Sequence, residues 1–182
     1  EAADRLGIAV MGPNCAGFAN FVDGIFAFAF LVEERERGGN IGMISQSGQI
    51  VLGGLDSPNM GFSHVISSGN SCNVKVEDYL DFLVDDEDTK VVAAYMEGVT
   101  KPEKLVAAFQ KAALKKKPVV VLKTGRSSKS QELAKSHTGS LSGADKVLRA
   151  VFKRYGVVEA GDLEELMSLA AAFSWLEELP QG

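Results

Sequence analysis

One polar stretch in the sequence combines the residue types that can hold a phosphoryl group. Ser45-Gln46-Ser47-Gly48 offers two hydroxyls and a glycine that allows close approach, directly before a predicted helix. The free backbone N–H groups and the dipole of a helix N-terminus both favour an anion at such a place. The alternative is that a serine here simply caps the helix, as serine does at many helices. The stretch therefore predicts either a phosphate site at Ser45, Ser47 and Gly48 or an ordinary helix cap.

A carboxylate and an imidazole are the other two candidates for chemistry. Glu97 follows an apolar run, and His137 lies in the polar stretch Ser136-His137-Thr138-Gly139-Ser140. A carboxylate that accepts the N–H of one imidazole nitrogen makes the other nitrogen a better base or nucleophile. A neutral His137 would then attack a phosphoryl group, and the helix N-terminus would hold the resulting anion. The alternatives are an exposed charge at a strand end for Glu97 and an exposed bystander for His137.

The elements that must position these residues repeat along the chain as short apolar runs, each followed by a helical pattern. Strands are predicted at 41–45, 64–68, 91–96, 119–122 and 156–159, and helices at 47–59, 76–84, 102–117, 142–155 and 162–178, with an earlier short strand at 8–11. Continuous apolar strands indicate burial on both faces, as in a parallel sheet between helices. The pattern predicts an α/β fold with a doubly wound, parallel five-stranded sheet in the flavodoxin-like order 2-1-3-4-5.

This strand order brings the candidate residues to one edge of the sheet. Ligands bind such sheets at the carboxyl ends of the strands, in the crevice between the first and third strands of this order. The predicted first strand ends at Ser45, Glu97 directly follows the third, and the polar stretch 124–143 leaves the neighbouring fourth strand. Connections longer than about 6 residues tend to be functional or disordered in such units. We therefore expect Ser45, Ser47, Glu97 and His137 to meet at this edge.

Composition excludes several other classes of protein. A net charge of −5 gives no electrostatic footprint for nucleic acid or an anionic membrane. Cys15 and Cys72 lie far apart with no metal-ligand spacing, and His64 opens an apolar strand, which favours a structural role. The apolar segment 24–32 is shorter than the roughly 20 residues of a membrane span. With no signal peptide, the expected location is the cytoplasm.

Four motifs occur in the order seen in one known family. They are Gly12-Pro-Asn-Cys-Ala-Gly17, Ser45-Gln-Ser-Gly48, Met96-Glu-Gly98 and Lys135-Ser-His-Thr-Gly-Ser-Leu-Ser-Gly143. In this order the chain resembles the NDP-forming acyl-CoA synthetases, which include ADP-forming acetyl-CoA synthetase and, more distantly, the α subunit of succinyl-CoA synthetase. The resemblance covers nearly the whole chain.

The resemblance implies roles for individual residues. His137 matches the histidine that the family phosphorylates, and Glu97 matches the glutamate that pairs with it. Ser45, Ser47 and Gly48 match the helix start that holds the phosphate. Asn14 and Cys15 match a turn near the CoA thiol. The implied reaction is acyl-CoA + phosphate + ADP ⇌ carboxylic acid + CoA + ATP, in which an acyl phosphate phosphorylates a histidine that then swings to a distant nucleotide site.

The same resemblance implies cofactors and partners outside this chain. In the family, CoA binds mainly to an N-terminal Rossmann domain, and ADP/ATP with Mg²⁺ binds to an ATP-grasp domain or subunit. The chain opens without Met and ends in a linker-like stretch, which suggests a piece of a longer polypeptide. We therefore expect residues 1–35 to be the tail end of a CoA-binding domain with a connecting segment, 36–178 the flavodoxin-like ligase domain, and 179–182 the start of a linker.

Two other functions remain open at this point. The chain could be a non-catalytic ligand-sensing or scaffold domain of a CoA-synthetase-like protein fused to an acetyltransferase. It could also be a flavin carrier or a phospho-acceptor receiver, which share the topology. A receiver needs an Asp at the end of the first strand, where Ser45 stands, and a flavin carrier needs aromatic side chains near this turn, which has none.

Overall fold

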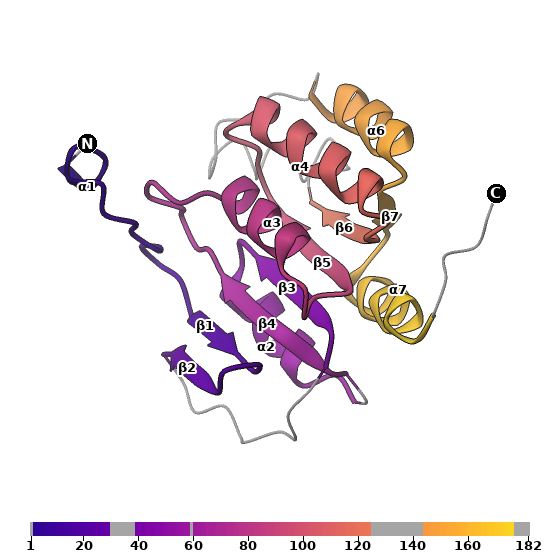
Figure 1. Cartoon of the computed structure of the whole chain (residues 1–182), viewed down its shortest axis with the longest axis horizontal. Helices are drawn as coiled ribbons and strands as arrows, with labels where there is room; N and C mark the ends of the chain where they lie inside the picture. Colours follow the sequence, from indigo (N-terminus) through magenta and orange to yellow (C-terminus); the bar gives the residue numbers. More distant parts are fainter. Residues whose placement is uncertain (1, 30–38, 59, 125–143, 177–182) are drawn as a thin grey trace.

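A computed structural model describes residues 2–29, 39–58, 60–124 and 144–176 of the chain (Figure 1). Its strands are β1 (Gly17–Asn20), β2 (Ile25–Phe28), β3 (Ile41–Ser45), β4 (Phe62–Ser67), β5 (Val91–Met96), β6 (Val119–Lys123) and β7 (Val158–Ala160). Its helices are α1 (Ala2–Leu6), α2 (Gly48–Leu55), α3 (Val76–Asp85), α4 (Pro102–Leu114), α6 (Ala144–Tyr155) and α7 (Leu163–Trp175). Among these described elements, no helix has both the length and the apolar character needed to cross a membrane.

The strands form one sheet in the order β2-β1-β4-β3-β5-β6-β7. From β4 to β7 neighbouring strands run parallel. Numbered along the chain from β3, these strands have the order 2-1-3-4-5, so the predicted α/β fold and flavodoxin-like order are confirmed.

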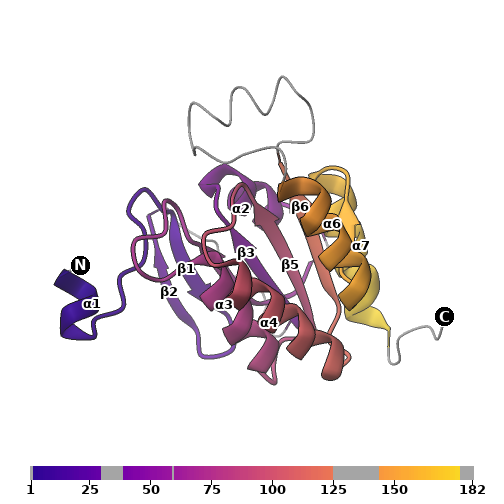
Figure 2. The same ribbon diagram turned by 90° about the horizontal axis from the view of Figure 1, so that it is seen from above.

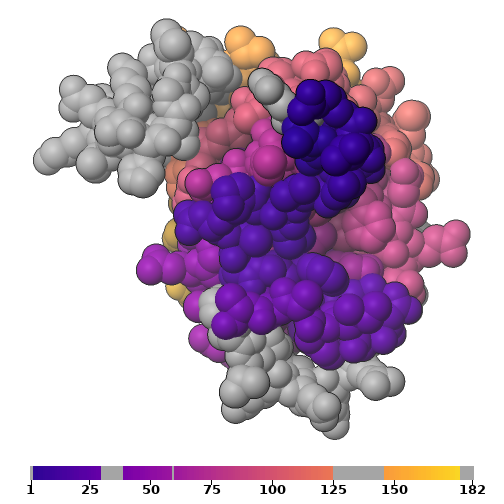
Figure 3. Space-filling view, turned by 90° about the vertical axis from the view of Figure 1, so that its left-hand side faces the viewer, coloured from indigo at the N-terminus to yellow at the C-terminus, as the bar shows by residue number. Residues whose placement is uncertain are grey.

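The predicted number of strands was wrong, because the sheet has seven strands rather than five. The two extra strands form an antiparallel hairpin, β1–β2, whose first strand pairs antiparallel with β4. The predicted strand at 8–11 was also wrong. Its backbone is tied to a side chain instead, since the Val10 N–H donates to Asn73 Oδ1 at 2.8 Å. In the space-filling view of Figure 3, this N-terminal segment and the hairpin lie on the same side of the molecule, in indigo and violet.

Two apolar cores cover the two faces of the sheet. Alternate residues of β5 divide between them: Val91, Ala93 and Tyr95 belong to one core, whereas Val92, Ala94 and Met96 belong to the other. Helices α2 and α7 bury apolar side chains in the first core, and α3, α4 and α6 do so in the second. Figure 2 shows α3 and α4 side by side on their face of the sheet. Because both faces are covered, the central strands are apolar throughout.

The parallel register aligns the carboxyl ends of the central strands. Ser45 of β3 lies opposite Tyr95 of β5 and, on its other side, opposite Ser67 of β4. Met96 of β5 lies opposite Lys123 of β6. Side chains alternate along a strand, so Ser45 points to the same face as Met43, which belongs to the core under α2 and α7. The turns that follow these strand ends form the edge where the candidate residues were predicted.

Candidate functional site

The turn from Ser45 to Gly48 connects β3 to the first residue of α2. The fully buried Ser45 hydroxyl accepts a hydrogen bond from the Ser47 N–H at 3.0 Å and donates one to the Ser47 carbonyl at 2.7 Å. Ser47 occupies the N-cap position with extended backbone, but its side chain makes no capping hydrogen bond. Ser45 therefore shapes the turn, and the N–H groups at the start of α2 are left without a side-chain cap from Ser47. This geometry favours the anion-site interpretation over the simple helix cap.

Gln46 joins this turn to the turn that contains Glu97. Its side-chain oxygen Oε1 accepts hydrogen bonds from the backbone N–H groups of Glu97, at 2.6 Å, and Gly98, at 3.1 Å. Its own backbone N–H donates to the carbonyl of Tyr95 at 3.3 Å. The Ser45–Gly48 turn and the Glu97 turn therefore lie beside each other, joined by the Gln46 side chain, while the site roles of Ser45, Ser47 and Glu97 stay predictions. Gln46 was not among the residues predicted from the sequence, where its only signal was a long amide side chain between two serines after a buried strand.

The half-buried Glu97 lies among polar groups from β5 and β6. Burial raises the pKa of the Tyr95 phenol, a hydrogen bond with Thr124 opposes this rise, and the Glu97 carboxylate beside the phenol adds to it. Lys123 Nζ donates to the backbone carbonyl of Glu97 at 2.8 Å and to that of Thr124 at 2.6 Å. Glu97 is thus held at its N–H by Gln46 and at its carbonyl by Lys123.

His137 lies outside the described residues, within 125–143. The structure does describe where this segment leaves the sheet. The N–H of Thr124 donates to the carbonyl of Met96 at 3.1 Å, so the chain departs from β6 directly beside the Glu97 turn. The contact between His137 and Glu97 remains a prediction.

A second turn, from Gly12 to Ala16, lies at the same edge beyond β4. The Ala16 N–H donates to Ser67 Oγ at 3.0 Å, and Ser67 pairs with Ser45 in the sheet. The peptide bond between Gly12 and Pro13 is cis. The carbonyl of Gly12 accepts from the N–H of residue 72, and that of Pro13 accepts from the N–H of residue 70. Asn14 is exposed with a positive φ of 55°, and Cys15 is half-buried. The candidates Asn14 and Cys15 therefore lie in the turn before β1, at the end of β4, the strand that neighbours β3.

Gly69 allows this second turn to approach the end of β4. It has a φ of +56°, a left-handed conformation that glycine adopts without strain. A Cβ at this position would lie 2.5 Å from the carbonyl oxygens of both Pro13 and Asn14. No other residue type fits between these carbonyls without moving the backbone.

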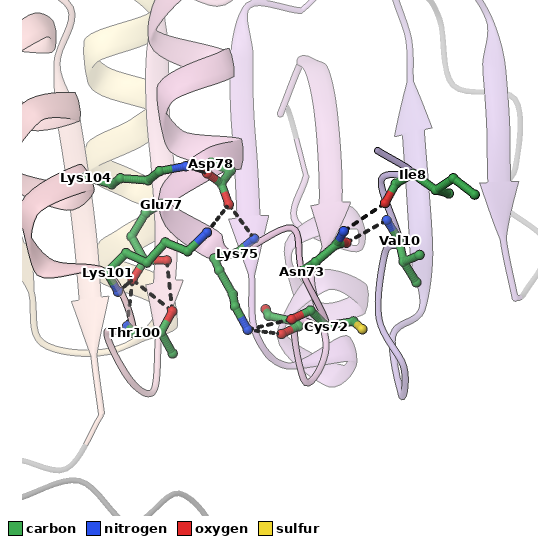
Figure 4. A network of polar contacts seen from close by, with 11 residues as sticks. Ile8, Val10, Cys72, Asn73, Lys75, Glu77, Asp78, Thr100, Lys101 and Lys104 are labelled. Atoms are coloured by element: carbon green, nitrogen blue, oxygen red, sulfur yellow. Dashed lines mark hydrogen bonds and ion pairs between the residues drawn. The ribbon is translucent and has the colours of Figure 1, made fainter. Parts of the chain in front are cut away.

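A polar network under the edge holds the segment that follows Glu97 (Figure 4). Glu77, at the start of α3, is fully buried, and its Oε1 accepts from the N–H groups of Thr100 at 2.7 Å and Lys101 at 3.0 Å. The neighbouring Asp78 accepts from the Lys75 N–H and pairs with Lys104. Glu77 therefore ties the start of α4 to α3. This buried carboxylate was not predicted from the sequence.

The other histidine has a structural position. His64 is buried in β4 near the opposite end of the strands, where it pairs in register with Gly42. Its Nδ1 lies 3.4 Å from Asp86 Oδ2, and its ring meets Phe82 edge to face. Across the described ranges, no group of three or more His, Cys, Asp and Glu side chains could hold a metal ion.

A parallel sheet in this order, with an uncapped helix start and a carboxylate turn at its switch point, defines a flavodoxin-like α/β domain with a candidate anion site. Residues 38–173 match the family model described as "Succinyl-CoA ligase like flavodoxin domain". The chain belongs to this family.

Relatives that match nearly the whole chain include ADP-forming acetate–CoA ligases. The chain is 41% identical over 180 residues to the enzyme from Methanocaldococcus jannaschii, covering 96% of this chain and 25% of that protein. It is 36% identical to the alpha subunit of ligase II from Pyrococcus furiosus, covering 100% of this chain and 39% of that subunit.

A solved structure supports the same relationship. "Ca. Korarchaeum cryptofilum dinucleotide forming Acetyl-coenzyme A synthetase 1 in complex with phosphate and ADP" matches with a TM-score of 0.87 and 30% identity, over 99% of this chain and 39% of that one. The chain thus spans between a quarter and two-fifths of the length of these relatives.

Proposed function

We propose that this chain is the phosphohistidine-carrying domain of an ADP-forming acyl-CoA synthetase, an acid–thiol ligase. The observation that carries the proposal is the Gln46 bridge, which holds the helix start at Ser47 and Gly48 beside Glu97. The segment with His137 leaves the sheet at this point. Two of the three groups proposed to form and hold a phosphohistidine, the helix start and Glu97, therefore lie at one edge of the sheet, and we propose that His137 acts there with them. The proposed reaction is acyl-CoA + phosphate + ADP ⇌ carboxylic acid + CoA + ATP.

In the proposed chemistry His137 is the nucleophile and Glu97 its partner. The carboxylate accepts the N–H of one imidazole nitrogen, so the other nitrogen keeps its lone pair. That nitrogen attacks the phosphorus of an acyl phosphate, an N–P bond forms, and the P–O bond to the acyl group breaks to release the carboxylate. The N–H groups at the start of α2 stabilise the phosphoryl oxygens. Transfer to ADP then breaks the N–P bond and regenerates neutral His137.

CoA, ADP/ATP and Mg²⁺ supply the thiol, the phosphoryl acceptor or donor, and charge neutralisation when bound. We assign these groups mainly to parts of the enzyme outside this chain. We propose the turn with the exposed Asn14 and the half-buried Cys15 for contact with CoA, because it lies at the same edge as Ser45.

We further propose that this chain works with a CoA-binding Rossmann domain and an ATP-grasp domain or subunit. The chain spans only part of each relative, and one of these relatives is an alpha subunit. In this proposal residues 1–35 are the end of the CoA-binding domain and a connecting segment that adds the β1–β2 hairpin to the sheet. Residues 36–178 form the ligase domain, which agrees with the family match at 38–173, and residues 179–182 begin a linker.

The test is to incubate the complete enzyme that contains this chain with ATP labelled on its γ-phosphate. We expect acid-labile, base-stable label on the wild-type protein and none on His137→Asn. The matched control is His64→Asn, which changes the other histidine and should keep its label if the protein remains folded. Label on His137→Asn at the wild-type level would overturn the proposal. Binding of acyl-CoA or phosphate with no label on any variant would support the alternative of a non-catalytic ligand-sensing or scaffold domain.

A further inference from the structure

We propose that Gln46 is the positioning residue that fixes Glu97 relative to the start of α2. The proposal rests on the function proposed above, in which Glu97 orients the imidazole of His137. No described side chain other than that of Gln46 is seen to accept from the N–H groups of Glu97 and Gly98. Because Gln46 also lies within the Ser45–Gly48 turn, its side chain sets the distance between the carboxylate and the helix N-terminus.

The backbone around Glu97 has two other anchors, neither of which can replace Gln46. Lys123 holds the carbonyl of Glu97, and Glu77 holds the N–H groups of Thr100 and Lys101 farther along the chain. Lys123 belongs to β6, and Glu77 belongs to α3. Among the described side chains, that of Gln46 connects Glu97 to the turn before α2. Loss of its oxygen would leave the N–H side of Glu97 free to shift while its carbonyl stays in place.

The neutral charge of Gln46 has a physical reason. A glutamate has the same length and could accept the same two hydrogen bonds. Its negative charge would, however, stand between the Glu97 carboxylate and the anion expected at the helix start, and like charges at such distances repel. An asparagine is one methylene shorter and would not span the present 2.6 Å contact without moving the backbone. Glutamine supplies an uncharged acceptor of the required length.

The proposal is tested with a double-mutant cycle on Gln46→Ala and Glu97→Gln in the complete enzyme, with His137 phosphorylation followed in rapid-quench experiments. We expect Gln46→Ala to slow phosphorylation by roughly 10- to 100-fold, since misplacement of a catalytic group by about 1 Å costs up to this much. If Gln46 acts through Glu97, the double variant is no slower than Glu97→Gln alone. The matched control is Gln110→Ala, an exposed glutamine on α4, which should react at the wild-type rate.

Two kinetic outcomes overturn the proposal: wild-type kinetics in Gln46→Ala, or a double variant slowed by the product of the two single effects. If Gln46→Ala does not fold, Gln46→Met replaces it, because methionine fills the same space without an acceptor. Amide hydrogen exchange at Glu97 and Gly98 should be faster in either variant, and unchanged exchange also overturns the proposal. Failure of the proposed function has a different signature, which is label on His137→Asn.

Discussion

Replacement of Glu77 by alanine should lower the free energy of unfolding by about 3 kcal/mol. The change removes a fully buried carboxylate and leaves the N–H groups of Thr100 and Lys101 without their acceptor. A hydrogen bond to a charged group contributes about 1.5–3 kcal/mol. Thr100 is exposed, so water can replace part of its loss, and we count the two bonds together as about 3 kcal/mol.

Two further effects of this substitution act in opposite directions. The buried methylenes of Glu77 add about 0.8 kcal/mol each to the loss. Removal of a desolvated charge returns a similar amount, because burying a carboxylate is costly in the wild-type fold. These effects offset each other, and the estimate stays near 3 kcal/mol. Glu77→Gln keeps the shape and one acceptor oxygen but loses the charge, so its cost should be about 1 kcal/mol.

The assay is urea denaturation of the 182-residue chain, monitored by circular dichroism. The free energies of unfolding of wild type, Glu77→Ala and Glu77→Gln are compared with one common m value, the slope of the free energy against urea concentration. The control is Glu87→Ala, an exposed glutamate whose loss should change stability by no more than about 0.5 kcal/mol. A loss below about 1 kcal/mol for Glu77→Ala would refute the reasoning, because two charge-assisted hydrogen bonds cannot be worth so little.

Two other predictions concern the chain's stability. Gly69→Ala should lower the free energy of unfolding by roughly 2 kcal/mol more than Gly156→Ala does. Both glycines have positive φ, but of the two only Gly69 has backbone atoms within 4 Å of an added Cβ. Equal urea midpoints for the two variants would contradict this prediction. Hydrogen bonds from Lys111 and Lys115 lower the pKa of Asp85 from its ordinary value to about 2. The resulting stabilisation is present above the unfolded pKa of about 3.9 and is lost as pH falls through about 2. Urea midpoints measured between pH 5 and pH 2 should therefore fall more steeply in wild type than in Asp85→Asn, and parallel curves would argue against the Lys–Asp85 contacts.

The sequence predicted the central sheet well because its strands are buried on both faces. The bounds of β3 and β5 agree with the predicted 41–45 and 91–96, where unbroken apolar runs end in polar turns. The β1–β2 hairpin was missed although Asp23-Gly24 between the two strands is a strong hairpin signal. The apolar residues of β2 were interpreted only as a run too short for a membrane. Their strand character depends on pairing with β1, and β2 itself lies at the sheet edge.

The site was predicted in part. The order of parallel strands was enough to bring the turns after β3 and β5 together, because carboxyl ends of parallel strands share an edge. Gln46 and Glu77 could not be found this way. Each acts on a backbone group at least 20 residues away in sequence. Such contacts depend on strand register and on the path of a loop, and hydrophobic periodicity carries information on neither.

The Gln46 bridge also makes the two turns thermodynamically dependent on each other. Any ligand at the start of α2 that favours one position of that turn will shift the populations of the Glu97 turn, because the amide joins them. Linkage is reciprocal, so a partner that holds the Glu97 turn must change the affinity of the helix start by the same factor. Ligand binding at one of these turns would then change the conformation of the other turn, while the strands of the sheet stay as they are.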